Sequence, residues 1–387
     1  MGALVISFDS VGDSVFEAMA ADGENHPNVA AFAREAYYRG GVKTTFVSNT
    51  YPVHATVATG KPPRDHGIVS NLLPPKKNGE RPWAQMAGQV KAKTLWDAAR
   101  EKKLSTAAML WPTTCGAKID RNMPETHPEK GQNPLFRGLL YGSALFQFSA
   151  LLRRGGKLVK ALKGGPGAGR AALDDFVVSV TCDMLKKEKP DLVMVHLLAY
   201  DMLFHFAGSK GPEIEIAKKT LDSSLGRLLE SWGGRGTVVV FSDHSQLDVN
   251  ENVDLRALYG DAVFEQVGGS AFLKSSGAIA DVEGRPWFGR YLTEGEMRES
   301  GYSGKSLVGV AAKPGCAFSE SGGYKGAHGY PADYENYAVF YGAKGENFPP
   351  GREQAWLKNR VTDVTAIVAR ELNLDMDVLD EYGVRRA

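Results

Sequence analysis

The sequence predicts an α/β protein with a mainly parallel central sheet, and three observations lead to this fold class. Short apolar runs alternate along the chain with segments whose apolar residues recur at helical spacing, the pattern of strands joined by crossover helices. The chain has 387 residues, 43% of them hydrophobic, which is enough for a large buried core. No stretch reaches the roughly 18 consecutive apolar residues of a membrane span, so we expect no transmembrane segment.

The expected elements follow in chain order. The run from Ala3 to Phe8 is uninterrupted by charge and indicates a buried strand close to the start of the chain. Strands are predicted at Leu4–Phe8, Ala107–Leu110, Leu192–Leu197 and Thr237–Phe241, and helices at Asn28–Tyr38, Leu95–Lys102, Ala171–Lys187 and Glu213–Trp232.

The alternation breaks in two places. Residues 74–89 and 124–169 are rich in Gly, Pro and Lys, and the run 163–169 is typical of a mobile loop. Between 247 and 323 the alternation is lost, and we interpret this segment as a cap inserted into a catalytic domain of residues 1–246 and 324–387. Within the first break, residues 135–163 are apolar with a basic end. We expect a helix packed over the core, with an interfacial amphipathic helix as the alternative.

Composition limits the classes of partner. The net charge of +1 gives no long-range field suited to a nucleic-acid polymer or an acidic membrane, so an anionic substrate must be attracted locally. The three cysteines are far apart and show no CxxC spacing, which favours reduced thiols. No signal peptide precedes the first strand, and with the thiols this predicts a cytoplasmic location. The sequence does not indicate the oligomeric state.

Acidic residues follow three of the predicted strands. Asp9, Asp201 and Asp243 should converge, because ligands of an open parallel sheet bind at the carboxyl ends of its strands. Converging anions require a cation. Three histidines accompany them: His205 stands four residues after Asp201 on one helical face, His244 is next to Asp243, and His328 lies in a Gly-rich loop. Six oxygen and nitrogen ligands without a thiolate suit two Zn²⁺ ions about 4 Å apart, with Mn²⁺ or Fe as alternatives.

A nucleophile is expected where a short helix begins. Thr50 stands at the position of an N-cap, followed by Pro52 and an apolar helix that ends at Gly60. Free backbone N–H groups and the positive end of the dipole make such a helix start a phosphate site. A metal beside the Thr50 hydroxyl would lower its pKa enough for nucleophilic attack, whereas without the metal site a plain N-cap is the better interpretation.

These segments resemble the nucleotide pyrophosphatase/phosphodiesterase branch of the alkaline phosphatase superfamily, in order and in approximate spacing over almost the whole chain. The matching strings are Val5-Ile6-Ser7-Phe8-Asp9, Asn49-Thr50-Tyr51-Pro52-Val53-His54, His66 to Asn71, Asp201 to His205, Ser242-Asp243-His244 and Gly326-Ala327-His328-Gly329. The resemblance implies an alkaline-phosphatase-like three-layer sandwich. It also implies that Asp201, His205 and His328 hold one zinc, that Asp9, Asp243, His244 and the Thr50 oxygen hold the other, and that Asn71 with the Thr50 N–H contacts a phosphoryl oxygen.

Two departures from the family's pattern affect the substrate pocket. The family usually has Thr-Phe-Pro-Asn-His where this chain has Thr50-Tyr51-Pro52-Val53-His54, and a common Gly after Asp-His is Ser245 here. We expect the organic part of the substrate to rest against the cap and Tyr51. Of the other histidines, we expect His54 and His66 to support the metal site, His196 to lie in the core or behind the ligands, and His26 and His127 to lie at the surface.

The predicted function is hydrolysis of a small phosphodiester or pyrophosphate by two zinc ions through a phospho-threonine intermediate. The neutral Asn71 suits a monoanionic diester, whereas a monoester dianion benefits from an added cation, for which Arg64 is the nearby candidate. A phosphonoacetate hydrolase-like C–P hydrolase and a phosphomonoesterase remain alternatives. Outside catalysis, the alternative is a metal- or lipid-binding module.

Overall fold

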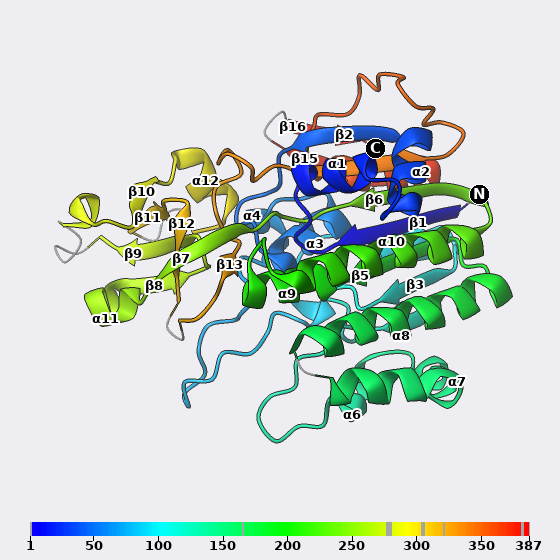
Figure 1. Ribbon diagram of the computed structural model, residues 1–387, viewed down its shortest axis with the longest axis horizontal. Helices are drawn as coiled ribbons and strands as arrows, with labels where there is room; N and C mark the ends of the chain where they lie inside the picture. Colours follow the sequence, from blue (N-terminus) through cyan, green and yellow to red (C-terminus); the bar gives the residue numbers. More distant parts are fainter. Residues whose placement is uncertain are drawn as a thin grey trace.

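A seven-stranded sheet forms the centre of the molecule (Figure 1). The computed structural model describes residues 2–164, 166–275, 281–302, 306–319, 322–380 and 383–386. The strand order is β2 (Tyr37–Val42), β14 (Val339–Lys344), β6 (Gly236–Phe241), β1 (Gly2–Phe8), β5 (Leu192–Leu197), β3 (Thr106–Met109) and β4 (Arg121–Met123). The five strands from β6 to β4 are parallel, and β14 is antiparallel to both β6 and β2. The mainly parallel α/β fold is therefore confirmed.

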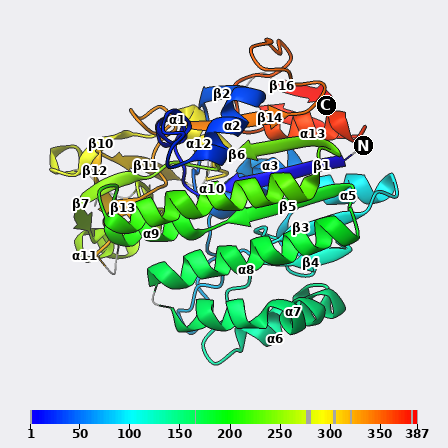
Figure 2. The same ribbon diagram turned by 45° about the vertical axis from the view of Figure 1, so that its right-hand side comes forward.

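Helices cover both faces of this sheet. One face carries α1 (Asp13–Ala21), α2 (Pro27–Glu35), α8 (Pro166–Lys187), α9 (Ala199–Ala207) and α10 (Pro212–Trp232), and the other carries α3 (Thr50–Thr59), α5 (Leu95–Glu101) and α13 (Asp363–Glu371). Figure 2 shows α8, α9 and α10 in front of the sheet. A one-turn helix, α4 (Pro63–His66), follows α3, and a hairpin of β15 (Asp377–Asp380) and β16 (Gly383–Arg386) ends the described chain. The result is the expected three-layer sandwich.

The sheet separates two apolar cores. Successive side chains of a strand point to opposite faces, and β1 follows this alternation. Leu4, Ile6 and Phe8 belong to the core under α8 and α10, whereas Ala3 and Val5 belong to the core under α3 and α13. Because β1 is buried on both faces, its sequence is a continuous apolar run, which made it recognisable as a parallel strand.

A helical hairpin lies outside the sandwich. The helices α6 (Pro134–Tyr141) and α7 (Ala144–Lys163) stack on the outer side of α8, away from the sheet (Figures 1 and 2). The stretch 135–163 is thus two helices. The predicted loop at 163–169 is wrong from residue 166 onward, because those residues begin α8; residue 165 lies outside the described residues. Among the described residues, no helix has both the length and the apolar character needed to cross a membrane.

A second group of strands lies beside the carboxyl ends of the central sheet (Figure 1). It contains a four-stranded sheet and a three-stranded sheet with an apolar core of their own. The elements are β7 (Leu247–Val253), α11 (Leu255–Tyr259), β8 (Val263–Gln266), β9 (Ser270–Lys274), β10 (Phe288–Tyr291), α12 (Glu294–Glu299), β11 (Leu307–Ala312), β12 (Gly315–Phe318) and β13 (Gly326–Ala327). Tyr330 and Tyr337, which lie outside residues 247–323, also belong to that core. The boundaries of the cap at 247 and 323 therefore stay a prediction.

One predicted helix is too long. The expected helix Asn28–Tyr38 ends at Glu35, and Tyr37 and Tyr38 begin the edge strand β2. The apolar residues before that point fit helical spacing, but Tyr37 faces the core while Tyr38 stacks on Phe16, as strand neighbours on opposite faces do. The spacing of apolar residues in the sequence does not indicate that the chain changes from helix to strand here.

Candidate metal centre

Three buried carboxylates meet at the carboxyl ends of neighbouring strands. Asp9 directly follows β1, Asp201 lies in the first turn of α9 after β5, and Asp243 is two residues beyond β6. Because β1 lies between β5 and β6 in the sheet, the three positions share one edge. All three side chains are buried. The convergence expected from the strand order is therefore present in the fold.

The three carboxylates and two of the histidines form two groups with the spacing of metal ligands. One group is Asp9, Asp243 and His244, and the other is Asp201, His244 and His328. Within each group the ligand atoms lie within 4.8 Å of one another. His244 belongs to both groups and therefore lies between them. His205 adjoins the second group, since its Nε2 is 3.4 Å from Asp201 Oδ1.

Each of the three imidazoles is fixed by a hydrogen bond at Nδ1. His205 Nδ1 donates to the carbonyl of Gly326 at 2.7 Å, and His328 Nδ1 donates to Asn49 Oδ1 at 2.9 Å. His244 Nδ1 lies 3.0 Å from Ser10 Oγ. That hydroxyl already donates its one proton to a carboxylate that can only accept, so it accepts from His244.

The Nε2 atoms of two of these rings face the carboxylates, because His205 Nε2 is 3.4 Å from Asp201 Oδ1 and His244 Nε2 is 3.2 Å from Asp243 Oδ2. Histidines that ligate metals commonly donate their second ring N–H to an oxygen in this way, which fixes the ring and leaves one lone pair for the ion.

Two oxygens of the buried carboxylates are without a hydrogen-bond donor among the described residues. Asp9 Oδ1 and Asp243 Oδ2 are buried and accept no hydrogen bond from a described residue. Burial, together with the Asp201 carboxylate, raises the pKa of Asp9 well above its usual range. Burial and the charge of Asp9 do the same to the pKa of Asp243. Buried anions without partners are costly, and divalent cations would satisfy both orphaned oxygens.

The imidazoles differ in their protonation. Burial and the neighbouring His328 lower the pKa of His244 well below its usual range. Burial and His205 lower the pKa of His328 to about 4. These two rings are therefore neutral at pH 7 and can act as ligands. Burial opposes a charge on His205, but the Asp201 carboxylate outweighs it and raises the pKa of His205.

Two glycines allow the His328 loop to approach. Gly329 has φ +85°, a left-handed conformation, and a Cβ there would overlap the carbonyl of Val267. A Cβ at Gly326 would overlap the ring of Phe204 on α9. The loop can therefore bring His328 to the rim only because positions 326 and 329 are glycine.

Thr50 faces the same rim from the start of α3. Its Oγ1 lies 3.2 Å from His244 Nε2. The helix begins at Thr50 itself and its N-cap is Asn49, so the predicted N-cap position of Thr50 is wrong by one residue. Asn49 does not cap the helix with its side chain, because Asn49 Oδ1 accepts from His328 instead. Because Asn49 and not Thr50 occupies the N-cap position, the Thr50 hydroxyl has no capping role.

Asn71 is held beside the helix start. Its Oδ1 accepts a hydrogen bond from the backbone N–H of Tyr51 at 2.9 Å. Since the amide oxygen is engaged, the amide N–H groups of Asn71 are its remaining polar function, and no described residue accepts a hydrogen bond from them. Asn71 thus brings a neutral donor to the N-terminal end of α3.

Several contacting residues were not identified from the sequence. Ser10 donates to Asp201 Oδ1 at 2.7 Å and, through its backbone N–H, to Asp243 Oδ1 at 3.1 Å. Gln246 Nε2 donates to Ser10 Oγ and to the Asp201 carbonyl. Adjacency was the only signal, because Ser10 follows Asp9 and Gln246 lies close to His244 in the chain.

Of the histidines expected beside or behind the metal ligands, His196 and His54 contact the carboxylates and His66 does not. His196 Nε2 lies 3.1 Å from Asp9 Oδ2. His54 bridges the carbonyl of Thr50 and the hydroxyl of Ser7, and its Nδ1 lies 3.5 Å from Asp243 Oδ2. His66 contacts Thr56 within α3 rather than the carboxylates.

Three expectations about exposure are wrong. Tyr51 is completely buried under the stacked rings of Trp83 and His127, so it cannot form an open pocket wall. His127 is half-buried in that stack and not on a free surface. His26 is buried as well, at 3% exposure. The rings that cover Tyr51 come from distant parts of the chain, which local sequence patterns do not reveal.

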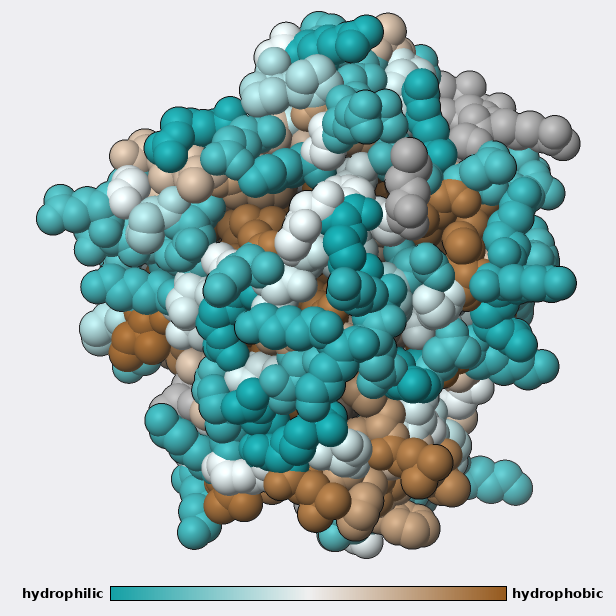
Figure 3. Space-filling view, turned by 90° about the vertical axis from the view of Figure 1, so that its right-hand side faces the viewer, coloured by the Kyte–Doolittle hydropathy of each residue, from teal (hydrophilic) through white to brown (hydrophobic). Residues whose placement is uncertain are grey.

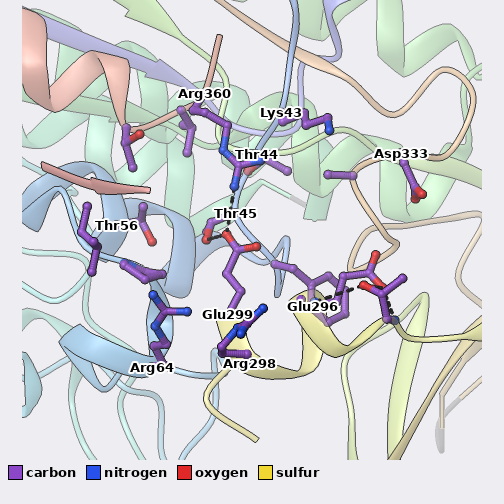
Figure 4. A pocket seen from close by; sticks show the side chains of 18 residues that line it. Lys43, Thr44, Thr45, Thr56, Arg64, Glu296, Arg298, Glu299, Asp333 and Arg360 are labelled. Carbon is purple, nitrogen blue, oxygen red and sulfur yellow. Dashed lines mark hydrogen bonds and ion pairs between the residues drawn. The ribbon is translucent and has the colours of Figure 1, made fainter. Parts of the chain in front are cut away.

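A charged cavity of about 640 Å³ lies behind the rim (Figure 4). Thr44, which lines it, donates its hydroxyl to the carbonyl of Asp243, so the two regions share a wall. Glu299 accepts from Thr45 at 2.6 Å and lies 3.8 Å from Arg360. Arg64 points into this cavity and pairs with the adjacent Asp65. In this cavity acids and cations neutralise one another.

Comparison with known proteins identifies a family and relatives for this chain. Residues 3–330 match the family described as type I phosphodiesterase / nucleotide pyrophosphatase. An uncharacterised pyrophosphatase/phosphodiesterase of Schizosaccharomyces pombe is 25% identical over 238 residues, which are 58% of this chain and 42% of that protein. The chain therefore spans less than half the length of this relative.

Solved structures share the fold. Human ectonucleotide pyrophosphatase/phosphodiesterase 5 aligns with a TM-score of 0.67 at 17% identity, over 97% of this chain and 96% of that chain. Its murine counterpart, an inactive variant in complex with AMP, aligns at 0.66 and 16% identity, over 99% and 97%. Phosphonoacetate hydrolase from Sinorhizobium meliloti 1021, in complex with phosphonoacetate, aligns at 0.66 and 15% identity, over 96% of both chains.

Proposed function

Because this chain belongs to the type I phosphodiesterase / nucleotide pyrophosphatase family, we propose that it hydrolyses phosphodiester or pyrophosphate bonds of small molecules with Thr50 as nucleophile and two zinc ions as cofactors. One observation carries the proposal. Three imidazoles at the rim are fixed through Nδ1 beside buried carboxylates, and Asp9 and Asp243 each have one oxygen that accepts no hydrogen bond from a described residue. A donor set of this kind fits metal ions and has no evident purpose in a metal-free core.

The residues fit two ions in the arrangement that the family resemblance implies. Asp9, Asp243, His244 and the Thr50 hydroxyl would hold one ion, and Asp201, His205 and His328 would hold the other. When bound, such ions neutralise charge on a phosphoryl group and favour ionisation of a nearby hydroxyl. Oxygen and nitrogen ligands accept Mn²⁺ or Fe as well as Zn²⁺, and zinc is our proposal for this chain.

Thr50 would act as the nucleophile. Its Oγ forms a bond to phosphorus while the bond from phosphorus to the leaving oxygen breaks, which gives a phospho-threonine and releases the alcohol or phosphate. Water then cleaves the Oγ–P bond and regenerates Thr50. The Thr50 N–H at the start of α3 and the Asn71 amide would donate to the phosphoryl oxygens.

The neutral charge of these donors favours a diester. A diester brings one negative charge and a second organic substituent, and Asn71 supplies a hydrogen bond without an added charge. Arg64, the nearest candidate for an extra cation, is directed into the neighbouring cavity and paired with Asp65. We therefore propose phosphodiesterase over phosphomonoesterase activity. A cytoplasmic location and a cap role for 247–323 stay predictions.

A substrate panel tests this function. Zinc-loaded protein should turn over bis-p-nitrophenyl phosphate far above a chelated blank, and with a higher kcat/KM than p-nitrophenyl phosphate. Phosphonoacetate serves as the third substrate, because a phosphonoacetate hydrolase shares the fold. Turnover of phosphonoacetate alone would replace the proposal with C–P hydrolysis. No turnover of any of the three by metal-loaded, folded protein would favour a binding module.

A further inference from the structure

The helical hairpin α6–α7 exposes an apolar surface that the catalytic proposal does not use. Its inner side is packed, because Phe146 and Ala150 join the core under α8. Its outer side carries large apolar residues, and Leu145 is the most exposed of them at 88%. Figure 3 shows apolar side chains gathered at the lower end of the molecule, where Figures 1 and 2 place this hairpin. The surface consists of Phe136, Leu140, Leu145, Phe148, Leu152, Val159 and Leu162, and we call it the α6–α7 face.

The exposed residues of α7 form one stripe. At 3.6 residues per turn, its five exposed apolar side chains fall within about a third of the helix circumference. Arg153 and Lys160 lie along one edge of this stripe, and Lys163 lies at its C-terminal end. An apolar stripe bordered by cations is the pattern of a helix that lies in a membrane interface.

Charge around the hairpin is segregated. Residues 130–173 contain eight Lys and Arg and no Asp or Glu, although the whole chain has a net charge of only +1. Two of these cations point inward, where Arg154 pairs with Asp183 and Lys157 pairs with Asp175 on α8. Arg153, Lys160 and Lys163 are exposed and form no ion pair with a described residue. The free cations are thus those beside the apolar stripe.

We propose that the α6–α7 face docks on anionic phospholipid membranes. The apolar side chains would enter the boundary between head groups and acyl chains, and Arg153, Lys160 and Lys163 would bind lipid phosphates. The inward ion pairs with α8 keep the hairpin attached to the enzyme, so only its outer side is available to lipid. The net charge of the whole chain, +1, gives no sign of this basic patch.

A second copy of the chain fits this face less well. Pairing two such faces would bring their cations together, and residues 130–173 provide no acid to compensate them. A lipid surface supplies both the apolar phase and the negative charge. Charge complementarity therefore favours an anionic membrane over a second copy of the chain as the partner of the α6–α7 face.

Vesicle binding tests the proposal. Full-length protein is sedimented with vesicles of phosphatidylcholine alone or with a quarter phosphatidylglycerol, at low and high salt. Binding should require the anionic lipid and weaken with salt. The triple variant Arg153→Gln, Lys160→Gln, Lys163→Gln should bind roughly 100-fold more weakly, since each cation near the surface contributes about fivefold.

The apolar contribution has a matched control. Leu162→Glu should reduce vesicle binding strongly, whereas Ile216→Glu on α10 should not, although the two side chains are 60% and 57% exposed. Unchanged circular dichroism and unchanged turnover of bis-p-nitrophenyl phosphate would show that these surface variants are folded.

Three results would overturn the proposal. They are wild-type protein that stays in solution with the anionic vesicles, equal binding of wild type and the triple variant, and a dimer in light scattering that Leu162→Glu dissolves without any vesicle binding. The last result would assign the face to a second copy.

Discussion

Two charged regions share a wall in this molecule and differ in how their charges are compensated. In the cavity behind the rim, Glu299 has Thr45 and Arg360, and other acids there also face guanidinium groups. At the rim, Asp9 and Asp243 each keep a buried oxygen without a hydrogen-bond partner. Both regions are rich in acids, so acidity alone does not identify a metal site. Buried carboxylate oxygens without a hydrogen-bond partner do identify one. Variants in the two regions should therefore respond differently.

The nucleophile should give the largest effect. Thr50→Ala should lower turnover by several orders of magnitude, because it removes the attacking oxygen, whereas Thr50→Ser should retain measurable activity. Thr59 is a matched control in the same helix, since its hydroxyl bonds only backbone groups, the carbonyl of Ala55 and the N–H of Lys61. Steady-state rates with an aryl diester decide the matter. Near-normal turnover by Thr50→Ala would mean that water attacks without a covalent intermediate.

Asn71 should come next. Asn71→Ala should cost about 2–4 kcal/mol of transition-state stabilisation, a loss of roughly 30- to 900-fold in kcat/KM, as for a lost oxyanion donor. Asn78→Ala, in the exposed loop that follows, should have no effect. If Asn71→Ala kept the wild-type kcat/KM for an aryl diester, its amide would be a structural partner of Tyr51 only.

Variants in the two regions should differ in how metal removal changes the stability of the protein. The raised pKa of Asp9 means that its ionised form costs free energy in the metal-free fold at neutral pH. Asp9→Asn should therefore raise the melting temperature of chelated protein, by the equivalent of about 1–2 kcal/mol, and reduce the stabilisation that zinc gives. Glu299→Gln should instead lower the melting temperature with or without zinc, because Thr45 and Arg360 lose the carboxylate that they contact. Equal responses of the two variants in thermal melts would remove the distinction between rim and cavity.

The smallest effect is expected for Arg64. Since it lies in the cavity and pairs with Asp65, Arg64→Ala should leave the ratio of diester to monoester kcat/KM unchanged within about twofold. The ratio is measured for matched aryl esters in wild type and variant. A wild-type preference for the monoester that disappears in Arg64→Ala would identify Arg64 as a phosphate-binding cation and overturn the diesterase assignment.

The sequence predicted the parallel half of the fold and the rim residues for one physical reason. Strands buried on both faces are continuous apolar runs, and a carboxylate directly after such a run must lie at the sheet edge. The edge strand β2, with Arg39, Gly40 and Gly41, lacks that signature, and its first residues, Tyr37 and Tyr38, fall within the helix that the sequence predicts. Ser10 and the cover over Tyr51 depend on contacts between distant segments, which no local pattern records.

Metal stoichiometry tests the central claim most directly. Elemental analysis of folded, zinc-reconstituted wild-type protein should find two ions per chain. Asp201→Ala or His328→Ala should leave one ion and an intact fold, because the cores lie elsewhere. One ion or none in the folded wild type would contradict the proposal that the rim is a two-metal site.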